Sequence, residues 1–451
     1  MRRIPPFRTP LVLLGLLAMA GCAVMETISE GIFDQRTPRE RYVDAVTAAG
    51  LDGTALAADW LAAAEQALTT APEVQAPHQE VGYLVPSEPT AIAYRIQARR
   101  GQEIHFTIEL PDDSTTLVFL DAWELDTTGE GEGPRLVESA DSLDRSLVLE
   151  PRRDGTYLLR AQPELLRGGR FTIFVRLAPT LAFPVSGRGE SDVGSRFGAS
   201  RDGGSRSHHG VDIFAPRGTP VVAASPGTVN RVGTNNLGGL TVWVRDDFGN
   251  RLYYAHLDSQ SVTSGQRVEV GDTLGTVGNT GNARTTPPHL HFGVYRRGEG
   301  PVDPWWFIHQ PRGSPPRLVA DTANLGEWVR VRADRAILRE APAARADSLR
   351  ALDRYTTARV VAAVGEWYRV RLPDGTPGYL SARTMERAGT AIAAALFTAA
   401  DSVLSSPAHN GQRNVMLEGT RPGERIDVLG RFEGFLMVRT PGGVSGWLEG
   451  T

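Results

Sequence analysis

The feature that most constrains the fold is a strict alternation of side chains over residues 288–295. Three apolar residues alternate there with two histidines: Leu290, Phe292 and Val294 with His289 and His291. Successive side chains of an extended chain point to opposite faces, so a strand puts both imidazoles on one face. A helix would spread the two histidines apart, and the β-branched valine disfavours it. The segment therefore predicts a strand that is buried on one face and carries paired imidazoles on the other.

The size and charge of the chain limit its domain count and its partners. With 451 residues the chain is too long for one core, and about 100–200 residues per domain suggest three or four domains. The net charge is −4 and the sequence pI is near 6.2. Without an overall positive field, nucleic acid is not expected as a partner.

The N-terminus has the form of a lipoprotein signal peptide. An apolar run from Leu11 to Met19 follows several arginines; it is too short to span a bilayer but fits a signal peptide. Ala20 and Gly21 then precede Cys22, the only cysteine, and this order resembles a lipobox in which the thiol is acylated. The alternative is an ordinary secretory signal with an incidental cysteine. We expect residues 1–22 to be a lipoprotein signal peptide. The protein would then be exported and anchored to the membrane through a lipid on Cys22.

Residues 23–80 are predicted to be a tether followed by a helical segment. Thr37 and Glu40 are spaced to form a capping box, with Pro38 in the first turn of a helix. The pattern ends near Gly50, and a second helix with an apolar stripe is expected from Thr54. A helix pair could bind a partner, but ordinary packing against the rest of the protein is the simpler interpretation.

Residues 81–180 change to a period of two. Ile104, Phe106 and Ile108 alternate with polar residues, and short turn sequences such as Asp154-Gly155 separate the runs. Several short strands joined by polar turns predict an antiparallel β-sandwich. The segment from Asp154 to Leu159 resembles the last strands of jelly-roll domains, which implies a sandwich of that type. We expect no catalytic residues in this segment.

An internal repeat occupies the C-terminal third of the chain. Trp367 and Phe435 begin two similar segments that lie 68 residues apart, and each ends in a Gly-aromatic-Leu sequence that contains Tyr379 or Trp447. Both segments resemble the end of bacterial SH3-like barrels, so we predict one SH3-like domain at 323–388 and a second at 389–451. Such modules often bind wall peptides or glycan through exposed aromatic residues. The alternative is that both aromatic residues fill small barrel cores.

Five of the nine histidines lie between residues 208 and 291, and they stand in patterns suited to a metal. His208 and Asp212 are four residues apart, so an extended segment would place them on one face. Two imidazoles and one carboxylate suit a catalytic zinc ion, which takes three protein ligands and keeps one position open. A further histidine, His256, lies in a strand-like run that begins at Arg251.

The order of these motifs resembles one enzyme family. H-x-x-x-D, then Y-x-H-L, then P-H-L-H-F, separated by Gly-rich turns, is similar to the LytM/lysostaphin-type zinc endopeptidases. The resemblance implies an antiparallel β metallopeptidase domain at 181–312. It assigns His208, Asp212 and His291 as ligands of one Zn²⁺ ion, and His256 and His289 as an unligated catalytic pair. His209 has no counterpart role, although it could compete as a ligand if the first strand slipped by one residue.

The resemblance also implies a reaction and a substrate. Zinc polarises a peptide carbonyl and lowers the pKa of a bound water from about 15.7 to about 7, and histidines can then transfer protons. Two Gly-rich turns, 235–239 and 279–282, are expected to form the rims of a substrate groove. We expect hydrolysis of peptide cross-links in bacterial peptidoglycan within the cell envelope. D,D-endopeptidase action is preferred, because a lipoprotein without positively charged wall-binding repeats suits a periplasm.

Three other functions remain open at this level. Some relatives have lost the metal residues and activate wall amidases by binding, but this chain keeps all five positions. A secreted protease for Gly-rich proteins would use the same chemistry. A purely adhesive protein would account for the SH3-like segments and leave the clustered histidines unexplained. The mainly β, multidomain fold with short N-terminal helices is common to all of these.

Overall fold

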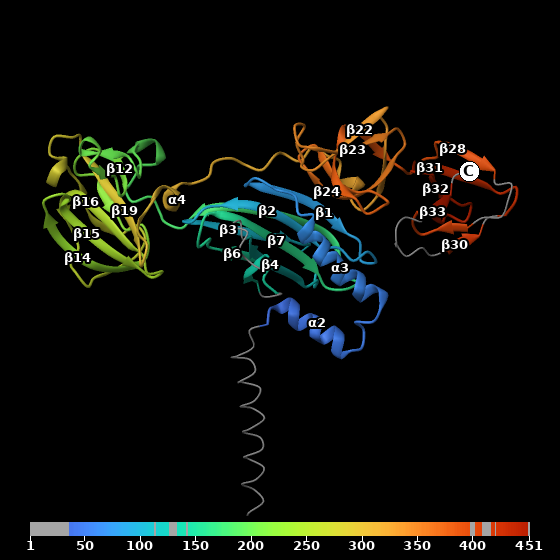
Figure 1. The fold of residues 1–451 in the computed structure, drawn as a ribbon, viewed down its shortest axis with the longest axis horizontal. Coiled ribbons are helices and arrows are strands. Elements are labelled where there is room, and N and C mark those ends of the chain that lie inside the picture. Colours follow the sequence, from blue (N-terminus) through green and yellow to red (C-terminus); the bar gives the residue numbers. More distant parts are fainter. Residues whose placement is uncertain are drawn as a thin grey trace, which may run out of the picture.

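The computed structural model describes residues 36–111, 114–125, 133–140, 143–396, 402–407, 416–419 and 421–449. Cys22 and the predicted signal peptide lie outside the described residues. The described chain is mainly β with short N-terminal helices, as predicted, and its β units follow one another along the longest axis (Figure 1). Within the described ranges, no helix is both long enough and apolar enough to cross a membrane.

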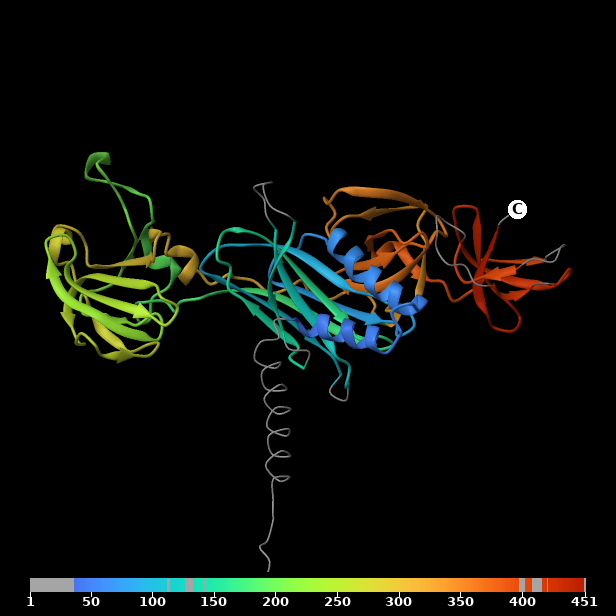
Figure 2. The ribbon, with the colours of Figure 1, turned by 60° about the horizontal axis from the view of Figure 1, so that its bottom comes forward.

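The two N-terminal helices begin where the sequence predicts. They are α2 (Pro38–Ala48) and α3 (Ala55–Thr69). Thr37 and Glu40 form the predicted capping box, and the side chain of Thr54 caps α3. Helix α3 packs against one sheet of the sandwich (Figure 2). The indole of Trp60 donates to the carbonyl of Pro163 at 2.8 Å. The helices therefore cover the sandwich, in agreement with the packing interpretation.

The predicted β-sandwich consists of two antiparallel sheets of four strands each. Its core is formed by residues that alternate along the strands, among them Ile104, Phe106 and Ile108, which are almost fully buried. Eight strands in two sheets is the arrangement of a jelly roll. The first sheet contains β1 (His78–Leu84), β8 (Gly169–Pro179), β3 (Gln102–Glu109) and β6 (Ser146–Leu149), and the second contains β2 (Ile92–Ala98), β7 (Gly155–Pro163), β4 (Val118–Glu124) and β5 (Arg135–Ser139).

The segment with the clustered histidines forms a separate antiparallel sheet. Its main strands run in the order β17-β14-β15-β16-β19-β12-β9, and one face of the sheet packs on a large apolar core. The strands are β9 (Val193–Ser195), β12 (Val211–Phe214), β13 (Pro220–Val222), β14 (Gly227–Asn235), β15 (Gly239–Asp246), β16 (Arg251–Gln260), β17 (Arg267–Val268), β18 (Thr273–Val277), β19 (His289–Arg296) and β20 (Gly300–Val302); a hairpin of β10 (Ser200–Arg201) and β11 (Arg206–Ser207) and the helix α4 (Trp305–Ile308) complete this part.

The first C-terminal unit is joined to the sandwich by a shared sheet, which the sequence analysis does not predict. Strand β24 pairs with β1, so that Val81 lies opposite Ala363. The pairing merges both units into one 11-stranded sheet. The strands of this unit are β21 (Trp328–Val331), β22 (Arg335–Arg339), β23 (Ser348–Asp353), β24 (Thr357–Val364), β25 (Trp367–Arg371), β26 (Pro377–Ser381) and β27 (Met385–Arg387).

The last unit is a six-stranded sheet that repeats the local pattern of the first. Its strands are β28 (Ala393–Leu396), β29 (Ser402–Leu404), β30 (Met416–Gly419), β31 (Arg425–Phe432), β32 (Phe435–Arg439) and β33 (Ser445–Glu449). Tyr379 on β26 and Trp447 on β33 are 1% and 2% exposed. Both aromatic residues of the repeat are therefore buried, which argues against a role as exposed binding residues.

Candidate metal centre

Strand pairing brings the predicted metal ligands together from distant parts of the sequence. Strand β19 lies between β12 and β16, and His291 is directly opposite both Asp212 and Ala255. Residues opposite one another in an antiparallel pair point to the same face. The apolar neighbours Leu290 and Phe292 point to the other face and are fully buried. The alternation in the sequence thus predicts this strand and its two faces correctly.

His208 also lies beside Asp212 and His291, but not because it is on the same extended strand, as was predicted. It precedes β12 instead of lying on it, and four extended residues would have carried it about 13 Å from Asp212. The chain instead turns at Gly210, where a Cβ atom would lie 2.5 Å from the carbonyl oxygen of Phe292. The backbone of His208 pairs with that of Gly198 and Ala199, which holds the imidazole over the sheet.

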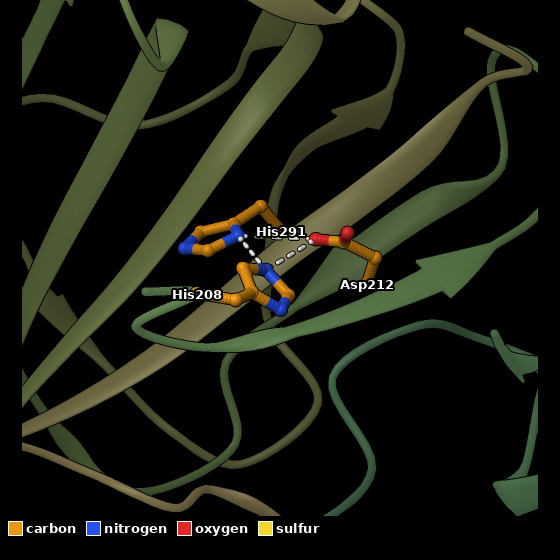
Figure 3. Close-up of side chains that lie close together, drawn as sticks. All are labelled: His208, Asp212 and His291. Atoms are coloured by element: carbon orange, nitrogen blue, oxygen red, sulfur yellow. Dashed lines mark hydrogen bonds and ion pairs between the residues drawn. The ribbon is translucent and has the colours of Figure 1, made fainter. Parts of the chain in front are cut away.

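Three side-chain atoms converge where these segments meet (Figure 3). Nε2 of His208 lies 2.9 Å from Nδ1 of His291 and 3.0 Å from Oδ1 of Asp212, and the last two atoms are 3.1 Å apart. Ligand bonds of about 2.0–2.1 Å to a tetrahedral zinc ion would put neighbouring donor atoms roughly 3.3 Å apart. The three donors, two imidazole nitrogens and one carboxylate oxygen, therefore fit a divalent ion of this kind in both chemistry and spacing.

Neighbouring groups fix the orientation of these donors. Nδ1 of His208 is 2.9 Å from the carbonyl oxygen of Arg196, and a neutral ring that donates there keeps its lone pair on Nε2. Arg201 donates to Oδ2 of Asp212 at 2.6 Å and to Oγ of Ser195 at 2.7 Å. Because Oδ2 is occupied by the guanidinium, Oδ1 is the oxygen that faces the two imidazoles. Arg201 has no regular spacing to the predicted ligands, so the sequence does not point to it.

Burial and hydrogen bonding shift the pKa values of two of these groups. Burial by itself would raise the pKa of Asp212, but the adjacent imidazoles of His208 and His291 outweigh it and hold this pKa far below its usual range. Burial lowers the pKa of His291, which favours its neutral form despite the nearby carboxylate. An ionised carboxylate and a neutral imidazole are the forms in which these side chains bind metals.

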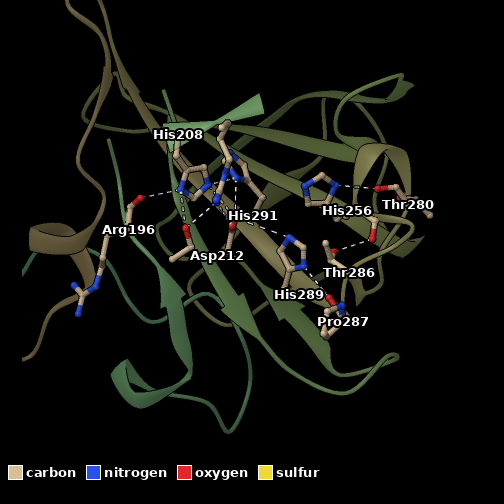
Figure 4. A network of polar contacts seen from close by, with 12 residues as sticks. Arg196, His208, Asp212, His256, Thr280, Thr286, Pro287, His289 and His291 are labelled. Atoms are coloured by element: carbon tan, nitrogen blue, oxygen red, sulfur yellow. Dashed lines mark hydrogen bonds and ion pairs between the residues drawn. The ribbon is translucent and has the colours of Figure 1, made fainter. Parts of the chain in front are cut away.

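The two other predicted histidines lie beside the three donors (Figure 4). The ring of His256 is 5.0 Å from that of His289 and 5.9 Å from that of His291. Nδ1 of His289 is 2.9 Å from the carbonyl oxygen of Pro287, and Nδ1 of His256 is 2.9 Å from that of Thr280. Each neutral ring that donates to its carbonyl keeps an Nε2 lone pair for other partners.

His256 is held in an unusual backbone conformation and electrostatic environment. Its φ of +62° is rare outside glycine, and such conformations gather at functional sites. Burial, with the nearby imidazoles of His289 and His291, lowers its pKa to about 4. His256 is therefore neutral at neutral pH. His209, by contrast, is exposed and stacks near Phe197 with a ring separation of 6.3 Å; it lines the groove but is not one of the three converging donors.

A groove of about 560 Å³ runs over the converged side chains. All five predicted site residues line it, as do Asn235, Leu237 and Gly238 from one predicted rim and Asn282 from the other. The floor beyond the histidines is formed by three aromatic residues that the sequence analysis did not single out: Trp243, Tyr253 and Tyr295.

Comparison with known proteins agrees with this geometry. The model of peptidase family M23 matches residues 206–304, which contain all five predicted site residues. The chain carries a peptidase family M23 domain. The bacterial SH3 domain model matches residues 334–386, within the first predicted SH3-like domain. The second such domain, predicted at 389–451, lies outside that match and stays a prediction.

The M23 domain is similar to peptidases of several bacteria. The L-Ala--D-Glu endopeptidase of Bacillus subtilis is 38% identical over 135 residues, which are 28% of this chain and 41% of that protein. The peptidoglycan DD-endopeptidase ShyC of Vibrio cholerae is 41% identical over 87 residues, which are 19% of this chain and 20% of that protein. The catalytic domain of lysostaphin from Staphylococcus simulans is 34% identical, with a TM-score of 0.23, over 25% of this chain and 86% of that one. The chain spans less than half the length of these two curated endopeptidases.

Proposed function

We propose that this protein is a zinc endopeptidase that hydrolyses peptide bonds in bacterial peptidoglycan. The observation that carries the proposal is the convergence of His208, Asp212 and His291 in one groove with two further imidazoles. The printed names of the related endopeptidases support the substrate class. A non-catalytic regulator would not need five such side chains in one groove, so the enzymatic function is the better explanation.

In this proposal, His208, Asp212 and His291 hold one zinc ion. When bound there, zinc would supply a Lewis acid that polarises the peptide carbonyl and makes a water molecule more acidic. Nε2 of His289 lies 3.9 Å from Oδ1 of Asp212, on the side of the metal donors. We therefore assign His289 to accept the proton of the attacking water and to pass it to the leaving amine, a role typically worth about 10²–10⁴-fold in rate.

His256 has a different part in this scheme. Because its Nδ1 donates to the carbonyl of Thr280, the neutral ring offers an acceptor at Nε2 and not a second donor. This geometry argues against donation from neutral His256 to a developing oxyanion. We assign it instead to hold an N–H or O–H group of the substrate or water in the groove, next to His289.

The proposed place of action and the proposed bond rest on sequence features. The lipobox-like Ala20-Gly21-Cys22 supports export and anchoring by a lipid at the membrane, facing the cell wall. We retain D,D-endopeptidase action on cross-links between stem peptides as the proposed specificity. The related endopeptidases carry names for two different bonds, so the bond is the first quantity to measure.

The test is digestion of purified peptidoglycan by the zinc-loaded full-length protein, with mass spectrometry of the released fragments. We expect cross-linked muropeptides to be converted to monomers with a new amino group at the cross-link. The Asp212→Ala variant should lose both metal and activity. Intact cross-links after complete zinc loading would contradict the D,D specificity, and the absence of any new amino end would contradict the enzymatic function.

A further inference from the structure

The floor of the groove continues past the metal centre on the same face of the sheet. In the next row along the strands, Tyr253 on β16 lies opposite Gly293 on β19 and Trp243 on β15. This row is two residues from the row of His291 and Ala255, which corresponds to roughly 7 Å along the strands. Register therefore places aromatic side chains directly beside the proposed reaction centre.

Trp243, Tyr253 and Tyr295 form one connected surface, which we call the aromatic platform. The ring of Tyr253 is 4.3 Å from that of Trp243 and 5.8 Å from that of His291, and the ring of Tyr295 is 5.1 Å from that of Trp243. All three side chains are partly exposed and line the same groove as the metal donors. The platform is therefore accessible from the groove and continuous with the metal centre.

Gly293 makes this arrangement possible. A Cβ atom on Gly293 would lie 3.0 Å from the ring of Tyr295 and 3.6 Å from Cβ of Tyr253. Without that atom, Tyr295 can lean across the strand toward the other two rings. The buried core does not need these rings, because Val242, Val244 and Phe292 on the opposite face already fill it.

Arginines border the platform on the side away from the metal. Arg231 lies opposite Trp243, and Arg245 lies opposite Arg251 in the next row. All three arginines are exposed, and none forms an ion pair with another residue in the part of the chain that the structure describes. Guanidinium groups bind carboxylates in a bidentate manner, so this rim is suited to an acidic group next to a ring.

We propose that the aromatic platform binds a sugar ring of the glycan strand from which the cleaved peptide extends. The proposal rests on the proposed function and specifies its substrate: stem peptides that are still attached to glycan. A pyranose presents a face of C–H groups that packs on aromatic rings, while its hydroxyls and those of the tyrosines remain in contact with solvent. Wall peptides are composed of small and charged residues and offer no such face. Their carboxylates instead fit the arginine rim.

The test measures binding to metal-free, full-length protein, so that it does not depend on cleavage. The probes are a disaccharide tetrapeptide from peptidoglycan and the same tetrapeptide without sugar, titrated by calorimetry. We expect the sugar-bearing probe to bind roughly tenfold more tightly, and Trp243→Ala to remove that difference without changing the affinity for the free peptide. Trp243→Phe should retain most of this difference in affinity, which distinguishes loss of the ring from a folding defect.

Phe248→Ala is the matched control, because Phe248 is an aromatic residue that is 72% exposed and does not line the groove. Its variant should bind both probes as the unaltered protein does. Equal affinities of the unaltered protein for the two probes, or an equal loss for both probes in Trp243→Ala, would overturn the proposal. If binding depends on the sugar but no cleavage occurs after zinc loading, the proposal for the platform stands and the peptidase function is refuted.

Discussion

Arg201 and Asp212 form an ion pair that gives the two oxygens of the carboxylate different partners. Nη2 of Arg201 lies 2.6 Å from Oδ2, while Oδ1 faces His208 at 3.0 Å and His291 at 3.1 Å. Asp212 is only 7% exposed, and Arg201 lines the same groove beside it. The pair fixes which oxygen can bind a metal, and it makes Arg201 a positioning residue in the proposed mechanism.

Arg201→Gln should weaken zinc binding by about 10–100-fold, which is typical when a group that orients a metal ligand is lost. Competition with a chromophoric chelator measures the effect independently of activity. Arg267→Gln serves as the control, since it breaks an exposed Arg–Asp pair with Asp247 outside the groove. Unchanged zinc affinity in Arg201→Gln would show that the carboxylate of Asp212 keeps its orientation without the guanidinium.

His289→Ala should keep zinc and lose activity. Its Nε2 is 3.9 Å from the nearest ligand oxygen, and it is not one of the three converging donors. We expect the rate of peptidoglycan hydrolysis to fall by about 10²–10⁴-fold while the zinc content stays near one ion per chain. Metal analysis and a muropeptide release assay on the same sample check both. Loss of zinc would instead make His289 a ligand.

Gly210→Ala should damage the metal centre without altering a ligand. A Cβ atom there would lie 2.5 Å from the carbonyl oxygen of Phe292 and 2.7 Å from Cε1 of His291, so β12 and β19 must move apart. We expect a loss of about 1–3 kcal/mol in the free energy of unfolding and weaker zinc binding. Gly189→Ala is the matched control, because Gly189 has φ −154° and no atom within 4 Å of its Cβ position. An equal response of both variants would refute the steric argument.

A buried ion pair joins the sandwich to the first C-terminal unit. Glu80 on β1 is 0% exposed, and its Oε1 lies 3.2 Å from Nη1 of Arg369 on β25. Glu80→Gln should lower the free energy of unfolding by about 3–5 kcal/mol, since it leaves a guanidinium buried without its carboxylate. Chemical denaturation at neutral pH measures this value. A loss no larger than that of Arg267→Gln would contradict the cost assigned to leaving Arg369 without its carboxylate.

The same pair predicts how stability changes with pH. Burial would raise the pKa of Glu80, but Arg369 and His78 lower it below its ordinary value of 4.5. A carboxyl whose pKa is lower in the folded state stabilises the protein above its unfolded pKa, and this contribution is lost as the pH falls through the folded pKa. Unfolding measured from pH 6 to pH 3 should therefore show a loss of stability that is smaller in Glu80→Gln.

Local patterns in the sequence were sufficient for the strand with His289 and His291 and for both helix starts, whereas the resemblance to a known family supplied the proposed ligand residues. Such features depend on side chains a few residues apart, because the periods of strands and helices are properties of the local backbone. The Gly-rich turns themselves follow from local backbone freedom, but their place at the rims of a groove was implied by the resemblance.

Tertiary structure alone decided the rest. The approach of His208 to Asp212 depends on a turn at Gly210 packed under β19, and the ion pair with Arg201 depends on a separate hairpin. The pairing of β1 with β24 joins residues nearly 300 positions apart, and the aromatic platform is assembled across three strands. Hydrogen bonds between distant strands leave no period in the sequence, because any two extended segments can pair and only the packing of the whole chain selects which ones do.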